Sequence, residues 1–231
     1  MQNERVTSID KRTRWESFTN IPLLILGAAF VVAFSLLVLN PDRSPAASIA
    51  LSAVIALSWA AFAIDYVVRF VLTPRGQRAH FFRHNLIDLM SVFLPIFRAL
   101  LVIGHLRDVP YFSHRDPGAV RVQVITYAAL YAIVFVYMMA LSTLQVERGA
   151  PGSTMKNFGD AIWWALVTIT TVGYGDEYPV TPLGRVFAVI LMFGGIAILG
   201  TASALVISVI NERIGVGERS AAAAAKKAAH E

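Results

Sequence analysis

The sequence predicts an all-α membrane protein built as a four-helix bundle followed by two long helices that are joined by a re-entrant loop. Charged residues make up 15% of the 231 residues, whereas soluble domains carry about 25%. Four stretches contain no Lys, Arg, Asp or Glu and are long enough to cross a bilayer, which takes about 20 apolar residues. These stretches are residues 21–39, 46–64, 122–146 and 186–210.

Basic residues are placed beside the ends of these stretches. The net charge is +5, and Lys and Arg precede the first stretch, follow the second and follow the last. This positive-inside pattern predicts a multi-pass protein of the cell membrane with both termini in the cytoplasm. It also indicates that the basic residues contact lipid headgroups and not nucleic acid. The first stretch is long and is followed by further spans, so we interpret it as a retained helix.

A weaker apolar region lies between the second and third stretches and is interrupted by Pro95 and Arg98. A single crossing there would place the last basic tail outside the cell, against the positive-inside pattern. Two crossings restore the pattern. Because proline breaks or kinks a helix, we expect two short helices, over residues 80–97 and 98–112, with a turn between Pro95 and Arg98.

The predicted crossings divide the chain into two membrane modules and two tails. The sequence Asp-Pro-Gly at residues 116–118 marks the boundary between the modules. The expected parts are a cytoplasmic N-terminus at 1–19, a four-helix module at 20–112, a two-helix module at 113–212, and a cytoplasmic tail at 213–231.

Several enzyme classes have no support in the sequence. The chain has no cysteine, which excludes disulfides, cysteine zinc sites and thiol catalysis. It lacks the H-E-x-x-H, G-x-S-x-G and phosphate-loop motifs, and its five histidines are scattered. We therefore expect no enzymatic activity and no cofactor.

The most informative segment lies between the last two apolar stretches. Asn157 can cap a helix, and Asp160 would then lie in its first turn. An apolar helix over residues 158–170 is predicted, about 20 Å long and so too short to cross a membrane. The hexapeptide TVGYGD at residues 171–176 follows it.

This hexapeptide has the properties needed to bind a dehydrated cation. Backbone carbonyls can replace a water shell if they all point toward one axis, which requires left- and right-handed backbone conformations to alternate. Gly173 and Gly175 stand at alternate positions and tolerate the left-handed conformation. The Thr171 hydroxyl can add a further oxygen. Each chain supplies one wall of such a site, and the known arrangement needs four chains.

Residues 168–176, TITTVGYGD, resemble the potassium-channel signature T-x-x-T-x-G-Y-G-D at every defined position. The resemblance implies a selectivity filter, a short pore helix before it, and a homotetramer in which three identical subunits complete the pore. K⁺ is then the permeant ion and not a resident cofactor. The implied filter residues are Thr171, Val172, Gly173, Tyr174 and Gly175, with K⁺ bound at the first four.

The resemblance extends to residues around the filter. Trp163 and Trp164 resemble the paired pore-helix tryptophans that, with Asp176, support the filter; interfacial anchoring is their alternative role. Glu147 resembles an acidic residue that fixes the outer pore mouth, and a solvated surface charge is the alternative. Gly195 aligns with a gating-hinge glycine, and close helix packing is equally compatible with it.

The first module resembles the voltage-sensor domain of six-helix channels. Phe62, Asp65 and Arg69 share one face of the second helix, and Asp88 falls in the third. The resemblance implies that Phe62, Asp65 and Asp88 stabilise a moving arginine. The alternative is that these acidic residues form static ion pairs with Arg69 or Arg98.

The fourth helix departs from the family pattern of an arginine at every third position. Only Arg98 and Arg107 carry charge in that register. The sequence therefore leaves voltage dependence open.

The function expected from the sequence is passive, K⁺-selective conduction through a homotetrameric pore. The alternatives are a leak or ligand-gated K⁺ channel and a K⁺ uptake subunit.

Overall fold

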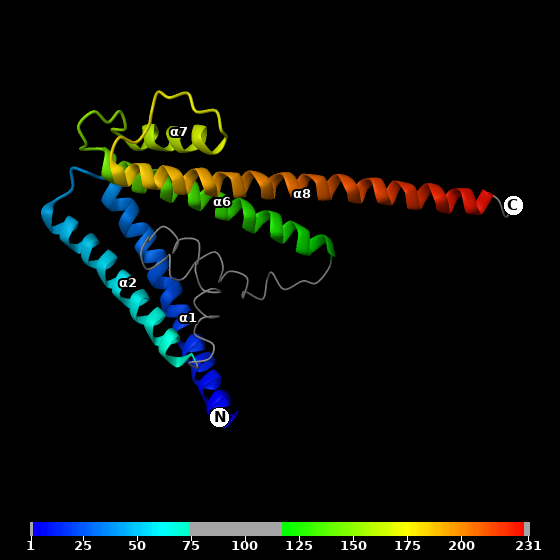
Figure 1. Cartoon of the computed structure of the whole chain (residues 1–231), viewed down its shortest axis with the longest axis horizontal. Coiled ribbons are helices and arrows are strands. Elements are labelled where there is room, and N and C mark those ends of the chain that lie inside the picture. The colour runs from blue at the N-terminus through cyan, green and yellow to red at the C-terminus, as the bar shows by residue number, and fades with distance from the viewer. Residues whose placement is uncertain (1, 74–116, 229–231) are drawn as a thin grey trace.

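The structure, a computed structural model of the chain, describes residues 2–73 and 117–228, and the regular elements of these residues are helices (Figure 1). An all-helical fold follows from long apolar runs whose polar backbone groups must be satisfied within each segment. The helices are α1 (Gln2–Leu39), α2 (Pro45–Leu72), α6 (Pro117–Glu147), α7 (Phe158–Ile169) and α8 (Pro182–Ala228).

The four predicted membrane spans are confirmed as helices. Among the described residues, four segments are long and apolar enough to cross a bilayer. They are Ile21–Leu39, Pro45–Leu72, Ile125–Glu147 and Pro182–Ile207. The predicted short helices at 80–97 and 98–112 lie outside the described residues.

Three of the helices begin in the same way. The first residues of α2, α6 and α8 are Pro45, Pro117 and Pro182, and proline suits this position because its missing N–H would have no partner there. The Ser44 hydroxyl accepts a backbone N–H of the first turn of α2 at 3.3 Å. The Thr181 hydroxyl does the same for α8 at 2.9 Å. These caps fix where the spans begin.

Two helices continue beyond the apolar stretches that the sequence marked. α1 begins at Gln2, and α8 continues through the alanine-rich tail to Ala228. Hydropathy reports only the part of a helix that fits the bilayer, whereas alanine favours helix in any solvent. The predicted tail at 213–231 is therefore helical over most of its length.

The helices share one buried core. α1 packs against α2 and α6, while α7 lies against both α6 and α8 (Figure 1). Side chains from α1, α6, α7 and α8 meet in a single apolar cluster, so the described parts of the two predicted modules are packed together. Its most buried members include Phe30, Val38, Met139, Leu144, Trp164 and Leu191.

Candidate functional site

The beginning of α7 is fixed by reciprocal hydrogen bonds. The Asn157 side-chain oxygen accepts the Asp160 backbone N–H at 3.2 Å. The Asp160 carboxylate accepts the N–H groups of Asn157 at 3.1 Å and Lys156 at 2.8 Å. This capping box satisfies backbone donors that the first turn leaves free. It confirms the predicted cap, and the helix is one residue shorter than the predicted 158–170.

The end of α7 turns the chain sharply into the TVGYGD segment. The Val167 carbonyl accepts two N–H groups, from Val172 at 3.0 Å and from Gly173 at 3.1 Å. The Thr170 hydroxyl donates to the Leu166 carbonyl at 2.7 Å. Because these bonds to α7 use the backbone N–H groups of Val172 and Gly173, the backbone carbonyls of the TVGYGD segment are left available to bind a cation.

Left-handed backbone conformations occur at every second residue of this segment. φ is +60° at Thr171, +56° at Gly173 and +79° at Gly175. The intervening Val172 and Tyr174 are not left-handed. The expected alternation at the two glycines is thus present. Sequence reasoning missed the left-handed Thr171, since such a residue costs about 1–3 kcal/mol and carries no local sequence signal.

One side of this segment is open in a single chain. Tyr174 is 68% exposed and Val172 is 53% exposed. The oxygens available to a cation here are backbone carbonyls and the Thr171 hydroxyl. In a single chain these carbonyls form one wall and do not surround an ion.

Trp163 joins α7 to the far end of the segment. Its indole N–H donates to the Asp176 carboxylate at 2.8 Å, and its ring stacks on Tyr174 with centroids 5.6 Å apart. Asp176 also accepts the Glu177 N–H at 3.0 Å. Trp164, by contrast, is buried in the apolar core. Of the two predicted tryptophans, the structure therefore brings Trp163 to the segment and places Trp164 in the packing beneath it.

The Trp163 indole N–H holds the pKa of the Asp176 carboxyl below its usual value of 3.8. A carboxyl whose pKa is lower in the folded than in the unfolded protein stabilises the folded state. This stabilisation is complete above the pKa of the unfolded state and is lost as the pH falls through the pKa of the folded state. We expect Trp163→Phe, which keeps the ring but removes the N–H, to move the acid-induced unfolding of the protein to higher pH. Far-UV circular dichroism of the protein in detergent, followed against pH, checks this, and an unchanged profile would refute it.

Glu147 is the last residue of α6 and is fully buried. Its carboxylate accepts the N–H groups of Val180 at 3.0 Å and Thr181 at 2.9 Å, and the Thr181 hydroxyl at 2.6 Å. It therefore ties the end of α6 to the beginning of α8, where the helix dipole also favours a negative charge. A solvated surface charge is inconsistent with this burial.

Gly184 makes this position of Glu147 possible, and sequence reasoning missed it. A Cβ at Gly184 would collide with Glu147 Oε1 and would lie 2.9 Å from the Pro179 side chain. The signal in the sequence is weak, because a glycine in the first turn of a helix has many uses.

Gly195 lies where α8 crosses the end of α7. A Cβ there would be 3.1 Å from the Ile169 Cα, which is a tight contact, and a Cβ at the neighbouring Gly194 would collide with the Phe135 ring of α6. α8 continues through both glycines as a helix. The geometry is that of close helix packing, and the predicted hinge role of Gly195 stays a prediction.

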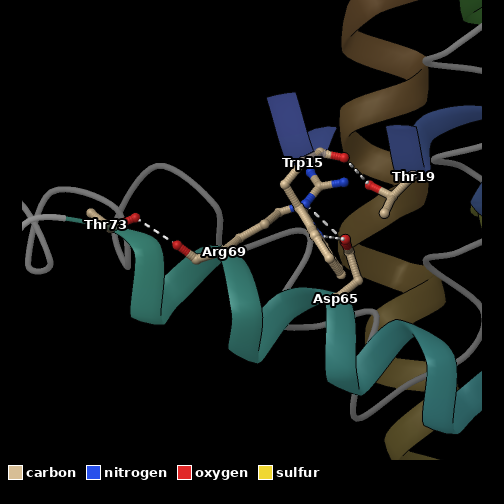
Figure 2. A network of polar contacts seen from close by, with 5 residues as sticks. All are labelled: Trp15, Thr19, Asp65, Arg69 and Thr73. Atoms are coloured by element: carbon tan, nitrogen blue, oxygen red, sulfur yellow. Dashed lines mark hydrogen bonds and ion pairs between the residues drawn. The ribbon is translucent and has the colours of Figure 1, made fainter. Parts of the chain in front are cut away.

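The predicted acidic site of the first module is already paired within the described residues. The Asp65 carboxylate accepts the Trp15 indole N–H at 3.0 Å and pairs with Arg69 Nε at 2.8 Å (Figure 2). Thr73, at the end of α2, donates its hydroxyl to the Arg69 carbonyl at 2.8 Å. Phe62 is buried one turn before Asp65. Asp88, Arg98 and Arg107 lie outside the described residues.

The hydrogen bond from Trp15 to Asp65, drawn in Figure 2, anchors the N-terminal half of α1 to α2. Trp15→Phe should lower the free energy of unfolding by about 1 kcal/mol, because a hydrogen bond to a charged acceptor is lost while the ring remains. Asp65→Asn in the Trp15→Phe background should then cost less than Asp65→Asn alone. Thermal denaturation in detergent measures both effects, and fully additive losses would show that the two residues do not interact.

Comparison with known proteins adds independent information on this chain. Residues 123–212, which hold α7 and the TVGYGD segment, match a family model described as ion channel. A cyclic nucleotide-gated potassium channel of Mesorhizobium japonicum is 30% identical over 199 residues, covering 76% of this chain and 53% of the relative. The chain thus spans about half the length of that relative.

Two further relatives match shorter regions of the chain. A voltage-gated potassium channel of Aeropyrum pernix is 52% identical over 54 residues, covering 23% of this chain and 18% of the relative. A calcium-gated potassium channel of Thermoplasma volcanium is 42% identical over 74 residues, covering 32% of this chain and 21% of the relative. Together with the family match over residues 123–212, these relatives support the assignment of the chain to the potassium channel family.

Proposed function

We propose that this protein is a subunit of a K⁺-selective channel that conducts passively through a homotetrameric pore. The observation that carries the proposal is the left-handed backbone at Thr171, Gly173 and Gly175. It alternates with residues that do not have positive φ, at the end of a short helix between two membrane spans. Alternation of this kind lets successive carbonyls replace the hydration shell of K⁺.

α7 has the features of a pore helix in this proposal. It has 12 residues, about 18 Å in length, and so ends within the membrane. Its carbonyl end carries a partial negative charge and directly precedes the Thr171 hydroxyl. K⁺ would bind at Thr171, Val172, Gly173 and Tyr174, with Gly175 completing the filter.

The exposed surfaces support assembly with three identical subunits. The filter side chains Val172 and Tyr174 are exposed, and so are large apolar residues of α8, including Val189, Phe193 and Ile196. Apolar surface of this extent on the pore helices is expected to be covered by neighbouring subunits and lipid. Four chains would supply the four carbonyl walls that K⁺ coordination requires.

The finer topology belongs to the same proposal. We infer that residues 80–112 cross the membrane twice, because only then do the basic residues of both tails face the cytoplasm. The subunit would then have six crossing helices, and both termini would lie on the cytoplasmic side of the cell membrane.

The gating stimulus stays open. The three relatives carry names with three different stimuli, namely cyclic nucleotide, voltage and calcium. Asp65 is already paired with Arg69 and Trp15. This pairing favours a static ion pair over the alternative role, in which Asp65 stabilises a moving arginine. A leak or ligand-gated channel fits this pairing as well as a voltage-gated one.

A flux assay tests the proposed function. Liposomes loaded with K⁺ and containing the purified protein should release K⁺ through the protein, and release should persist without any energy source. K⁺-loaded liposomes without the protein, treated with a K⁺ ionophore, give the total amount of K⁺ that can be released. Release that is absent, or equally fast for Na⁺, would contradict the proposal.

A further inference from the structure

α1 and α6 of the same chain are packed together along segments that are apolar enough to cross a membrane. Phe30 and Val38 of α1 are 2% and 0% exposed, and both belong to the cluster formed with α6 and α7. Phe34 stacks on Phe30 with ring centroids 5.9 Å apart. α1 belongs to the predicted four-helix module at 20–112. α6 belongs to the predicted two-helix module at 113–212, which is the pore module of the proposed channel. This contact therefore joins the two modules.

A hydrogen bond between two hydroxyls lies within this apolar contact. Tyr137 of α6 donates to the Ser35 hydroxyl of α1 at 2.7 Å. Ser35 in turn donates to the Val31 carbonyl at 2.7 Å. Because the Ser35 proton is used on its own helix, the Tyr137 proton is fixed in its direction toward α1. A hydroxyl in hydrocarbon that loses its partner has no water to replace it.

The same tyrosine touches the helix that precedes the filter. The Tyr137 ring meets Phe158 edge-on, with centroids 5.7 Å apart and an angle of 68° between the planes. Phe158 is the first residue of α7, immediately after the capping box. The other end of α7 holds the Val172 and Gly173 N–H groups through Val167. A short helix moves as a rigid body, so a displacement at Phe158 reaches the TVGYGD segment.

We propose that Ser35 and Tyr137 form a coupling link that connects α1 to α7 and the filter within one and the same subunit. Tyr137 acts as a positioning residue: its hydroxyl follows α1 and its ring holds the first turn of α7. In the assembled channel, the first module therefore rests on the pore module of its own chain and not on that of a neighbour. The effect of the link on flux rests on the proposed function, whereas its location within a subunit does not.

Cross-linking tests the location of the link. The chain has no cysteine, so Ser35→Cys and Tyr137→Cys together create one unique pair of thiols. The tyrosine ring that separated the two positions is removed by the substitution, and a short bis-maleimide can bridge the gap that it leaves. Tetramers are assembled from equal amounts of ¹⁵N-labelled and unlabelled double variants, and the cross-linked peptides are identified by mass spectrometry. Joined peptides should be fully light or fully heavy. Mixed light–heavy peptides, or no cross-link at all, would overturn the proposal.

A double-mutant cycle tests the coupling. Tyr137→Phe keeps the ring against Phe158 and removes only the hydroxyl, while Ser35→Ala removes the acceptor. We expect K⁺ release from liposomes to fall by the same factor, about threefold, in each single variant and in the double variant, because all three lose one shared bond. Ser52→Ala, on an exposed position of α2, is the matched control and should leave release unchanged.

The outcomes separate the link from the proposed function. Effects that are absent or that multiply in the double variant would overturn the coupling. Wild-type protein that releases no K⁺ while it still gives purely light and purely heavy cross-links would refute the channel function and leave the location of the link standing.

Discussion

Replacing Gly173 with alanine is expected to abolish K⁺ conduction while leaving the subunit folded. Gly173 has φ of +56°, where an alanine costs about 1–2 kcal/mol in each chain. No atom lies within 4 Å of the added Cβ, so the effect comes from the backbone and not from a clash. The segment relieves the strain by rotating its peptide planes, which turns carbonyls away from the ion path. Single-channel or macroscopic current in a bilayer measures the loss.

Gly152 supplies a matched control for this substitution. It has φ of +80° and likewise has no atom within 4 Å of an added Cβ, but it lies in the loop after α6. Gly152→Ala should therefore carry a comparable backbone cost and retain K⁺-selective current. Equal losses in the two variants would mean that general destabilisation explains the result, and unchanged current in Gly173→Ala would contradict the filter assignment.

Replacing Glu147 with glutamine is expected to destabilise the junction of α6 and α8 by about 2 kcal/mol per subunit. The carboxylate accepts three hydrogen bonds in a fully buried position. An amide group of the same shape would turn N–H donors toward the donors of Val180 or Thr181, and a buried donor without an acceptor costs about 1–3 kcal/mol. The Tm of the protein in detergent should fall by several degrees.

Gly184→Ala tests the same contact from the other helix. The added Cβ would collide with Glu147 Oε1, so the carboxylate must leave its site. The loss of stability should match that of Glu147→Gln, and combining the two should add little. Gly149→Ala is the control, because its Cβ would meet no atom within 4 Å. Stability that is lost only in Gly149→Ala would refute this account of the junction.

The parts of the structure that depend on neighbouring residues were predictable from the sequence. The Asn157 and Asp160 cap, the short helix after it and the left-handed glycines of the TVGYGD segment each rest on side chains within a few positions. The four apolar spans follow from composition alone. In all of these cases the physical cause lies in the segment itself, so no knowledge of the packing was needed.

The parts that depend on distant residues were not predictable. Trp15 bonds to Asp65 across 50 positions, and Tyr137 bonds to Ser35 across 102. Many tryptophans and serines in a membrane protein would fit either role equally well on sequence alone. The same holds for Gly184, whose importance is visible only once Glu147 is placed against it. The beginning of α1 at Gln2 was also missed, since hydropathy marks the bilayer and not the helix.

Current through a planar bilayer, recorded in asymmetric K⁺ and Na⁺ under voltage steps, tests the central claim most directly. The account predicts a current that reverses near the K⁺ equilibrium potential and that is lost in Gly173→Ala. The dependence of conductance on voltage in the same record would show whether the first module senses voltage. A current that reverses near zero in this gradient, or no current from correctly assembled tetramers, would contradict the account.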